Sequence, residues 1–224
     1  MGEGGRALAL SASRLVIWRG LDEWRTEVAA IRLEPDGVEA RGTQIGLEPL
    51  PYRLDYRLEA PQRFVTRLLE LEVAGGGWGR RLRLLHDGQG SWECKAEETG
   101  DPDAELPAAG GQTAGLAEAL DCDLGLSPLT NLMPIRRHHL HEGPGEAAFL
   151  MAWVSVPDLG LHASAQRYEH LRLEPPGAVV RFTDEGMFKG FSCELELDAD
   201  GLIRTYPDLA GRVGAAQAPE DPSS

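Results

Sequence analysis

Hydrophobic and polar residues alternate with a period of two along much of the chain. Residues 52–58, 69–73 and 191–197 each place apolar side chains at every second position, with mostly charged or polar residues between them. Successive side chains of a strand point to opposite faces, so each run predicts a strand with one buried and one solvated face. Half-buried strands of this kind are typical of antiparallel sheets.

Turn signals separate these strands. Asp-Gly pairs at 36–37, 87–88 and 200–201 are flanked by strand-like runs and predict tight hairpins, because this pair tolerates a positive φ angle. Residues 147–156 are apolar at almost every position and predict a central strand covered on both faces. Pro157 is expected to end that strand, since proline has no N–H for the ladder.

Helical patterns are scarce. Only residues 113–120 favour a helix, and they predict a short helix or a 3₁₀ turn. Residues 96–115 are rich in Gly, Pro and acidic residues, which predicts either a mobile loop or a boundary between two halves, with the loop favoured. We expect a mainly β chain in which residues 1–213 form one domain and residues 214–224 form a disordered tail.

Composition excludes several classes of function. The 224 residues include 36 acidic and 22 basic ones, and the net charge of −14 disfavours nucleic-acid binding. The longest apolar stretch is about half of the roughly 20 residues that a transmembrane helix needs. We see no secretory signal, and the three cysteines lack CxxC spacing, which predicts reduced thiols in a cytoplasmic protein.

The densest polar segment spans residues 120–137. It contains Asp121, Asp123, Thr130, Asn131, Arg136 and Arg137. Two prolines and an asparagine predict a rigid, irregular path that holds these side chains in place. The Asp and Arg residues could form an internal ion-pair network or a clamp for a carboxylate, phosphate or sugar hydroxyl pair. If the path is extended, Arg136 and Arg137 point to opposite faces.

Metal and enzyme signatures are weak. On a strand, His139 and His141 would share a face and could begin a metal site, with Asp121, Cys122 or Asp123 as the further ligand. A solvated histidine run is the favoured interpretation, and we expect no metal and no cofactor. The sequence has no GxSxG, GxxxxGK[ST], HExxH or GxGxxG motif, so no catalytic residue is assigned.

The same polar segment carries a family resemblance. DCDL followed by SPLTNLMPIRR, at residues 121–137, resembles the pattern D-x-D-L and T-P-x-T-N-T-L-P-I-R-R-L of a bacterial family described as "Putative glycolipid-binding". Further matches run in the family's order from about residue 12 to residue 212. They are the motifs at 87–92, 156–159, 166–168, 200–202 and 206–207, and Arg212. Ser127 and His138 depart from the pattern, which has Thr and commonly Leu there.

The resemblance implies a fold and a function. The fold is a spiral β-roll: one strongly curved antiparallel sheet, or open barrel, with one or two short helices, similar to lipoprotein carriers. The implied function is non-enzymatic binding of a glycolipid or other amphipathic acyl ligand in the concave face. We expect the ligand to be bound by Asp121, Asp123, Thr130, Asn131, Arg136, Arg137, Gln166, Tyr168, Tyr206 and Arg212.

Three alternatives remain open. The protein could be an enzyme acting on a sugar or acyl ester, with Asp121 or Asp123 as general base and Arg136 stabilising an anion. It could be an interaction module that docks another protein through edge strands or an exposed patch. The Asp and Arg residues could also be internal struts that set the register of a curved sheet. The oligomeric state is not predicted.

Overall fold

The computed structural model describes residues 12–102 and 105–214, and these form one large sheet with three short helical segments. The strands are β1 (Ala12–Gly20), β2 (Arg25–Glu34), β3 (Gly37–Gly46), β4 (Tyr52–Ala60), β5 (Leu68–Ala74), β6 (Trp78–His86), β7 (Trp92–Gly100), β8 (Asp121–Leu124), β9 (Glu146–Val154), β10 (Leu161–Glu174), β11 (Gly177–Asp184), β12 (Ser192–Leu197), β13 (Ile203–Tyr206) and β14 (Ala210–Arg212). The helical segments are η1 (Ala114–Leu116), η2 (Pro128–Asn131) and α1 (Leu132–Arg137). The predicted mainly β fold is confirmed.

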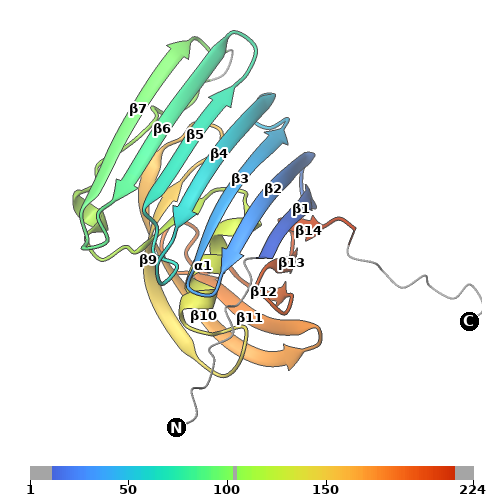
Figure 1. Cartoon of the computed structure of the whole chain (residues 1–224). Coiled ribbons are helices and arrows are strands. Elements are labelled where there is room, and N and C mark those ends of the chain that lie inside the picture. Colours follow the sequence, from blue (N-terminus) through green and yellow to red (C-terminus); the bar gives the residue numbers. More distant parts are fainter. Residues whose placement is uncertain (1–11, 103–104, 215–224) are drawn as a thin grey trace, which may run out of the picture.

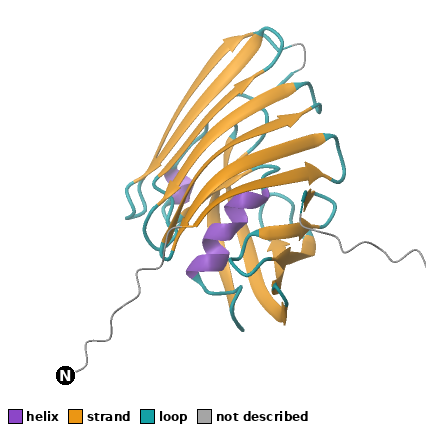
Figure 2. Ribbon diagram, turned by 45° about the vertical axis from the view of Figure 1, so that its right-hand side comes forward, coloured by secondary structure: helices purple, strands orange, loops and turns teal. Residues whose placement is uncertain are grey.

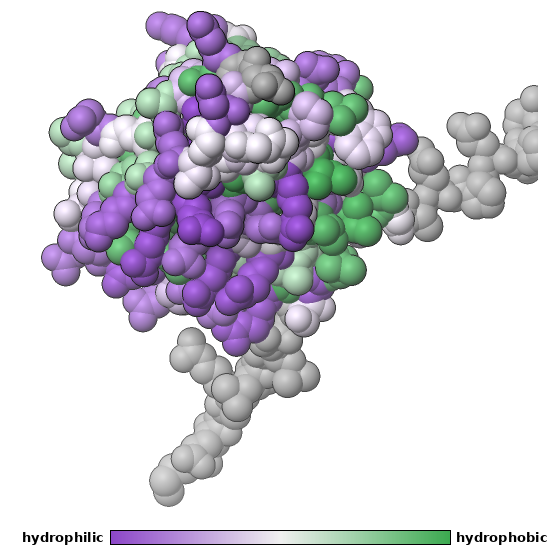
Figure 3. All heavy atoms as spheres, turned by 90° about the horizontal axis from the view of Figure 1, so that it is seen from above, coloured by the Kyte–Doolittle hydropathy of each residue, from purple (hydrophilic) through white to green (hydrophobic). Residues whose placement is uncertain are grey.

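Alternating side chains explain the strands. In β4, Tyr52, Leu54, Tyr56 and Leu58 are all buried, and the residues between them are exposed or partly exposed. Burying such a side chain contributes roughly 1.5–3 kcal/mol, so the buried face determines which way each strand is turned. Polar residues dominate much of the outer surface in Figure 3, and hydrophobic residues gather at one side of that view.

The sheet curls into two layers. The strands pair in the order β7-β6-β5-β4-β3-β2-β1-β14-β13-β12-β11-β10-β9-β8. In Figure 1, β1 to β7 form one layer, and β9 to β12 cross behind it as the second. The helical segments lie between the layers (Figure 2). The expected strongly curved sheet is therefore confirmed.

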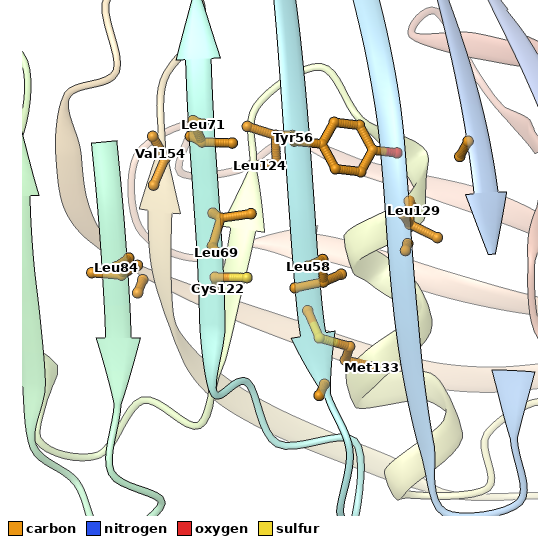
Figure 4. Packing of buried hydrophobic residues seen from close by; sticks show 14 of the residues in the cluster. Tyr56, Leu58, Leu69, Leu71, Leu84, Cys122, Leu124, Leu129, Met133 and Val154 are labelled. Atoms are coloured by element: carbon orange, nitrogen blue, oxygen red, sulfur yellow. The ribbon is translucent and has the colours of Figure 1, made fainter. Parts of the chain in front are cut away.

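Side chains fill the interior of the roll. One hydrophobic cluster joins the inner faces of β1 to β6 to β8, η2, α1 and β9, and Figure 4 shows Met133 and Cys122 facing Leu58 and Leu69. A second cluster joins Ile135 of α1 to the inner faces of β10 to β13. The concave surface of the first layer, where an acyl chain was expected, is thus occupied by the protein itself.

Chain segments from the two ends of the described structure meet in the middle of the sheet. β1 pairs with β14 through three residue pairs, from Trp18↔Arg212 to Gly20↔Ala210. This seam makes the β1–β7 layer and the β9–β14 layer one continuous sheet. Residues 215–224, which include most of the tail predicted to be disordered, lie outside the described residues.

Much of the polar segment is helical, whereas we expected a rigid, irregular path. Residues 128–137 are helical, forming η2 and then α1. Ser127 caps the start, because its Oγ accepts a hydrogen bond from the Leu129 backbone N–H at 3.3 Å, and Pro128 follows at the first helical position, which needs no N–H. Arg136 and Arg137 are therefore consecutive helical residues rather than residues on opposite faces of a strand.

Three further expectations need correction. β9 is not covered on both faces along its length, because only Met151, Ala152 and Val154 of it are buried. Its outer neighbour β8 has four residues and pairs only with residues 151–154, so the first half of β9 has one strand neighbour. The β8–β9 pair is also parallel, whereas the other described strand pairs are antiparallel. Finally, β7 continues to Gly100, into the segment expected to be a loop.

Two smaller expectations have plain outcomes. The predicted short helix or 3₁₀ turn within residues 113–120 is confirmed by η1. Across the described part of the chain, no helix combines the length and apolar character needed to span a membrane.

Candidate functional site

A cleft of about 450 Å³ opens at one end of the second layer. It lies between the segment that follows β8, the end of β9, the buried faces of β10 and β11, and the turns after β11 and β13. Its lining residues are Asp22, Asp123, Leu124, Gly125, Leu126, Ser127, Asn131, Trp153, Ser155, Val156, Gln166, Phe182, Asp184, Phe188, Phe191, Tyr206, Pro207, Asp208 and Leu209.

A hydrogen-bond network forms the polar part of the cleft. Asp123 accepts a hydrogen bond from Thr130 Oγ1 on one carboxylate oxygen and from Gln166 Nε2 on the other, both at 2.7 Å. The Tyr168 hydroxyl lies 2.8 Å from Asn131 Oδ1 and 3.0 Å from Gln166 Oε1, and so bridges the two amides. Each polar side chain is held in one orientation by another, which preorganises the surface for a ligand.

Burial raises the pKa of Asp123 to about 6. Removal from water is the main cause, and the nearby carboxylates of Asp184 and Asp121 act in the same direction. The hydrogen bonds from Thr130 and Gln166 oppose the shift. With a pKa of about 6, this carboxyl is mostly ionised at pH 7, so the cleft contains a partly desolvated negative charge.

Asp184 shapes the turn that forms one side of the cleft. Its Oδ1 accepts hydrogen bonds from the backbone N–H groups of Gly186 and Phe188, at 2.8 and 2.9 Å. The turn therefore presents Phe188 toward Trp153, and their rings meet edge to face with 5.8 Å between centroids. Phe188 is 59% exposed, which is unusual for a large aromatic side chain and places an apolar surface at the mouth.

Other aromatic rings continue this wall inward. Phe182 lies 6.2 Å from Phe191 and 5.9 Å from Tyr206 between ring centroids. Phe182 and Tyr206 are buried, whereas Phe191 is partly exposed. The cleft thus combines an aromatic wall with a network of carboxylate and amide groups, an arrangement typical of sites that orient a small ligand.

Six of the ten residues expected to bind a ligand gather here. Asp123, Asn131, Gln166 and Tyr206 line the cleft, and two more, Thr130 and Tyr168, hold them from behind. The remaining four are Asp121, Arg136, Arg137 and Arg212, and none of them lines the cleft.

Asp121 and Arg137 form a buried ion pair. Arg137 Nη1 donates to Asp121 Oδ1 at 2.6 Å, and Nη2 donates to Oδ2, so the guanidinium is bidentate. The side chains are 5% and 1% exposed. Arg137 also lies over the Phe149 ring at 5.5 Å. This geometry joins α1 to β8 and matches the internal-strut interpretation of the motif.

Arg136 and Arg212 are engaged elsewhere. Arg136 Nη1 lies 3.0 Å from Nε2 of the buried His141, and its guanidinium lies over Phe64. Arg212 donates to the Ile203 carbonyl oxygen and to Asp198, beside the seam. His139 and His141 follow α1 rather than sharing a strand face, and no cluster of three potential metal ligands occurs among the described residues.

A buried carboxyl that was not predicted from the sequence, that of Glu27, lies beside the cleft. Glu27 Oε1 accepts hydrogen bonds from Tyr56 at 2.7 Å and from Ser127, a cleft residue, at 2.8 Å. Burial raises its pKa to about 7. The alternation of β2 could have revealed it, because Glu27 stands two residues before Ala29 and therefore on the same buried face as Ala29, Ile31 and Leu33. Asp184, Phe188 and Trp153 were also missed as site residues, since no pattern distinguishes them from turn and core residues.

A family model and a solved structure are similar to this chain. The model of the family described as "Putative glycolipid-binding" matches residues 15–212. The fold is similar to the crystal structure, at 1.80 Å resolution, of a DUF1089 family protein from Pseudomonas aeruginosa, with 29% identity and a TM-score of 0.60 over 88% of this chain and 95% of that one. No curated protein matches the chain. Because the family model spans nearly the whole described sheet, the chain belongs to the family described as "Putative glycolipid-binding".

Proposed function

We propose that this protein binds a glycolipid or a similar amphipathic acyl molecule, without chemical turnover, in the cleft between the ends of β9 to β11 and the turns after β11 and β13. The observation that carries the proposal is the combination, in one cleft, of a fixed polar network and an aromatic wall that reaches the surface. An amphipathic ligand needs both surfaces at once.

The polar network suits a sugar head group. Hydroxyl groups both donate and accept hydrogen bonds, and Asp123, Asn131 and Gln166 offer carboxylate and amide groups in fixed orientations. Tyr206 and Phe182 also line the cleft, where the apolar part of a sugar ring can pack against them. The binding elements are thus on strands and a helical segment, which hold them rigidly.

The mouth of the cleft suits an acyl chain. Phe188 and Phe191 line the cleft and are exposed by 59% and 38%, and Met187, in the same turn between β11 and β12, is exposed by 43%. Each methylene group that a ligand buried against this surface would contribute about 0.8 kcal/mol. The site therefore differs from the expected one, because the concave surface of the first layer is filled by η2, α1 and β8.

The structure favours binding over the enzymatic alternative. That alternative required a carboxylate and Arg136 to converge on one cavity, and Arg136 does not line the cleft that contains Asp123. Asp121 is bonded to Arg137 inside the protein. The proposed base and the proposed anion stabiliser therefore lie apart, which supports binding without turnover.

Native mass spectrometry of the protein purified from its own host, followed by organic extraction and lipid analysis, tests the proposal. We expect a stoichiometric adduct whose extract contains an acyl chain and a polar head. A bare protein that also binds nothing from a panel of glycolipids and fatty acids would overturn it.

A variant of the exposed aromatic residue tests the location. Phe188→Ser should weaken binding of a dodecyl glycoside about tenfold, because roughly 1.4 kcal/mol of apolar contact is lost. Leu173→Ser is the matched control: Leu173 is 62% exposed and lies at the far end of β10, outside the cleft. Equal affinities for the two variants, measured by isothermal titration calorimetry, would place the site elsewhere.

A further inference from the structure

The charged residues that line the cleft all have the same sign. Asp22, Asp123, Asp184 and Asp208 are among the lining residues, and no Lys, Arg or His is. This distribution was not expected, because three of the ten residues predicted to bind a ligand are arginines. The charged side chains that line the cleft are therefore carboxylates, with the Arg25 guanidinium bound to Asp22 at the edge, in a molecule whose net charge is −14.

Within the described part of the chain, one of these four carboxylates pairs with a basic side chain. Asp22 forms a salt bridge with Arg25 at 2.8 Å. Within residues 12–102 and 105–214, no salt bridge joins Asp123, Asp184 or Asp208 to a basic side chain. Asp123 and Asp184 instead accept neutral hydrogen bonds, from Thr130 and Gln166 and from backbone N–H groups. Such bonds orient a carboxylate but leave its negative charge uncompensated.

The aromatic wall adds to the same preference. The face of an aromatic ring carries negative electrostatic potential, so it attracts a cation that lies over it. Trp153, Phe188 and Phe191 belong to the same cleft as the carboxylates. Rings and carboxylates together form the kind of surroundings that recognises organic ammonium groups. The same surroundings repel a phosphate or a carboxylate on a ligand.

We propose that the head group bound in this cleft carries a protonated amine, as in an amino-sugar lipid. The inference rests on the proposed function, because it names the ligand class of that same cleft. The amine lies near Asp123 and Asp184, where it replaces part of its lost hydration with charge-assisted hydrogen bonds. Arg136 and Arg137 of the family motif have no part in head-group recognition.

Three ligands that share a dodecyl chain and a sugar ring, but differ in charge, test whether the cleft prefers an amine. Dodecyl glucoside is neutral, its 2-amino-2-deoxy analogue carries an ammonium group, and dodecyl glucuronide carries a carboxylate. Calorimetric titration below the critical micelle concentration should give the tightest binding for the amine, at least tenfold tighter than for the carboxylate. Equal affinities, or tightest binding of the glucuronide, would overturn this inference and leave the proposed function standing. If none of the three binds, the proposed function fails as well.

Paired variants exclude a general attraction of cations to an acidic protein. Asp123→Asn and Asp184→Asn should each reduce the ratio of amine to neutral affinity several-fold, and using a ratio removes any common effect of altered folding. Asp36→Asn removes the same charge from the exposed turn between β2 and β3 and should leave the ratio unchanged. If Asp36→Asn lowers the ratio as much as Asp123→Asn, the preference belongs to the net charge and the inference is wrong.

Discussion

Two aspartates of one short strand have different roles. Asp121 and Asp123 stand two residues apart in β8, yet Asp121 is paired with Arg137 inside the protein and Asp123 faces the cleft. Residue type and spacing alone would suggest that the two carboxylates share one function. What separates them is the partner that the fold supplies: a guanidinium for one, and neutral hydrogen-bond donors for the other.

The ion pair leads to a prediction about stability. Arg137→Met should lower the free energy of unfolding by about 3–5 kcal/mol, because it leaves the Asp121 carboxylate buried without a counter-charge. The double variant Asp121→Asn with Arg137→Met should recover part of this loss. Arg172→Met is the control, since Arg172 is half exposed and its ion pairs are worth less than about 1 kcal/mol. Equal losses in urea for Arg137→Met and Arg172→Met would contradict the structural role.

Glu27 leads to a prediction about pH. Burial raises its pKa in the folded protein from the ordinary value of 4.5 to about 7. Between these values the folded state holds a proton that the unfolded state has released, so stability falls as pH rises, by about 3 kcal/mol in total. The penalty is absent below about pH 4.5 and complete above about pH 7.

The variant Glu27→Gln isolates this effect. Glutamine keeps an acceptor for Tyr56 and Ser127 but does not ionise in this range. The difference in unfolding free energy between Glu27→Gln and the unmodified protein should therefore grow in favour of the variant from pH 4.5 to pH 8. Chemical denaturation at a series of pH values measures it. A difference that stays constant with pH would show that Glu27 does not hold its proton in the folded state.

Among the strands, the two at the edges of the sheet, β7 and β8, differ in length and in the exposure of their side chains. β8 is short, and a loop and η2 follow it directly. β7 has nine residues, and beyond Trp92 all of them are exposed or partly exposed, with Glu93, Lys95 and Glu97 among them. An exposed edge strand can pair with another molecule, and charged side chains oppose such pairing.

This edge gives a prediction about association. Replacing Lys95 and Glu97 by valine should make the protein associate in a concentration-dependent way, because the edge then presents apolar side chains beside unpaired N–H and C=O groups. Glu70→Val with Arg83→Val is the control, since these residues lie on the interior strands β5 and β6 and already face each other in a pair. Sedimentation velocity that shows the same state for both variants would contradict the role of β7.

At the scale of the whole molecule, the seam between β1 and β14 holds the two layers together. Three residue pairs connect these strands. Arg212 adds hydrogen bonds to the Ile203 carbonyl oxygen and to Asp198, and it lies over the Trp18 ring at 5.9 Å. The cleft depends on this arrangement, because the turn after β13, which carries Pro207 and Asp208, is fixed by the strands on both sides of it.

Truncation tests the seam. A chain that ends after residue 209 loses β14 and should lose about 3 kcal/mol or more of stability, since β1 and β13 lose a strand partner, Asp198 loses one of its two arginine partners, and Trp18 loses the guanidinium over its ring. A chain that ends after residue 214 retains β14 and should unfold like the full chain. Thermal and urea unfolding compare the two. If the shorter chain unfolds at the same midpoint as the longer one, the seam does not join the layers.

Much of the fold could be predicted locally. The alternation of residues 52–58 and 69–73 identifies β4 and β5, because burial of one face is decided by period two alone. The helical segment at 128–137 was not predicted, although Ser127-Pro128 is a recognisable start of a helix. Its apolar side chains pack against both layers of the sheet, so they do not form the single apolar stripe that identifies a helix in a sequence. Likewise, the first half of β9 has no strand partner on one side because β8 is short, and the composition of β9 itself does not reveal this.

Residues close along the chain were enough to predict several of the strands, the Asp-Gly turns and the acidic character, and a contiguous motif was enough to indicate the family. Which polar residues line the cleft depends instead on tertiary packing. Asp123 and Gln166 are 43 positions apart and Asp184 and Phe188 belong to a turn, and a hydrogen bond or a cleft between such residues depends on how the layers pack. Tertiary packing also decided the surroundings of the two motif arginines: α1 lies inside the roll, where Asp121 neutralises Arg137, whereas Arg136 contacts His141 and the Phe64 ring.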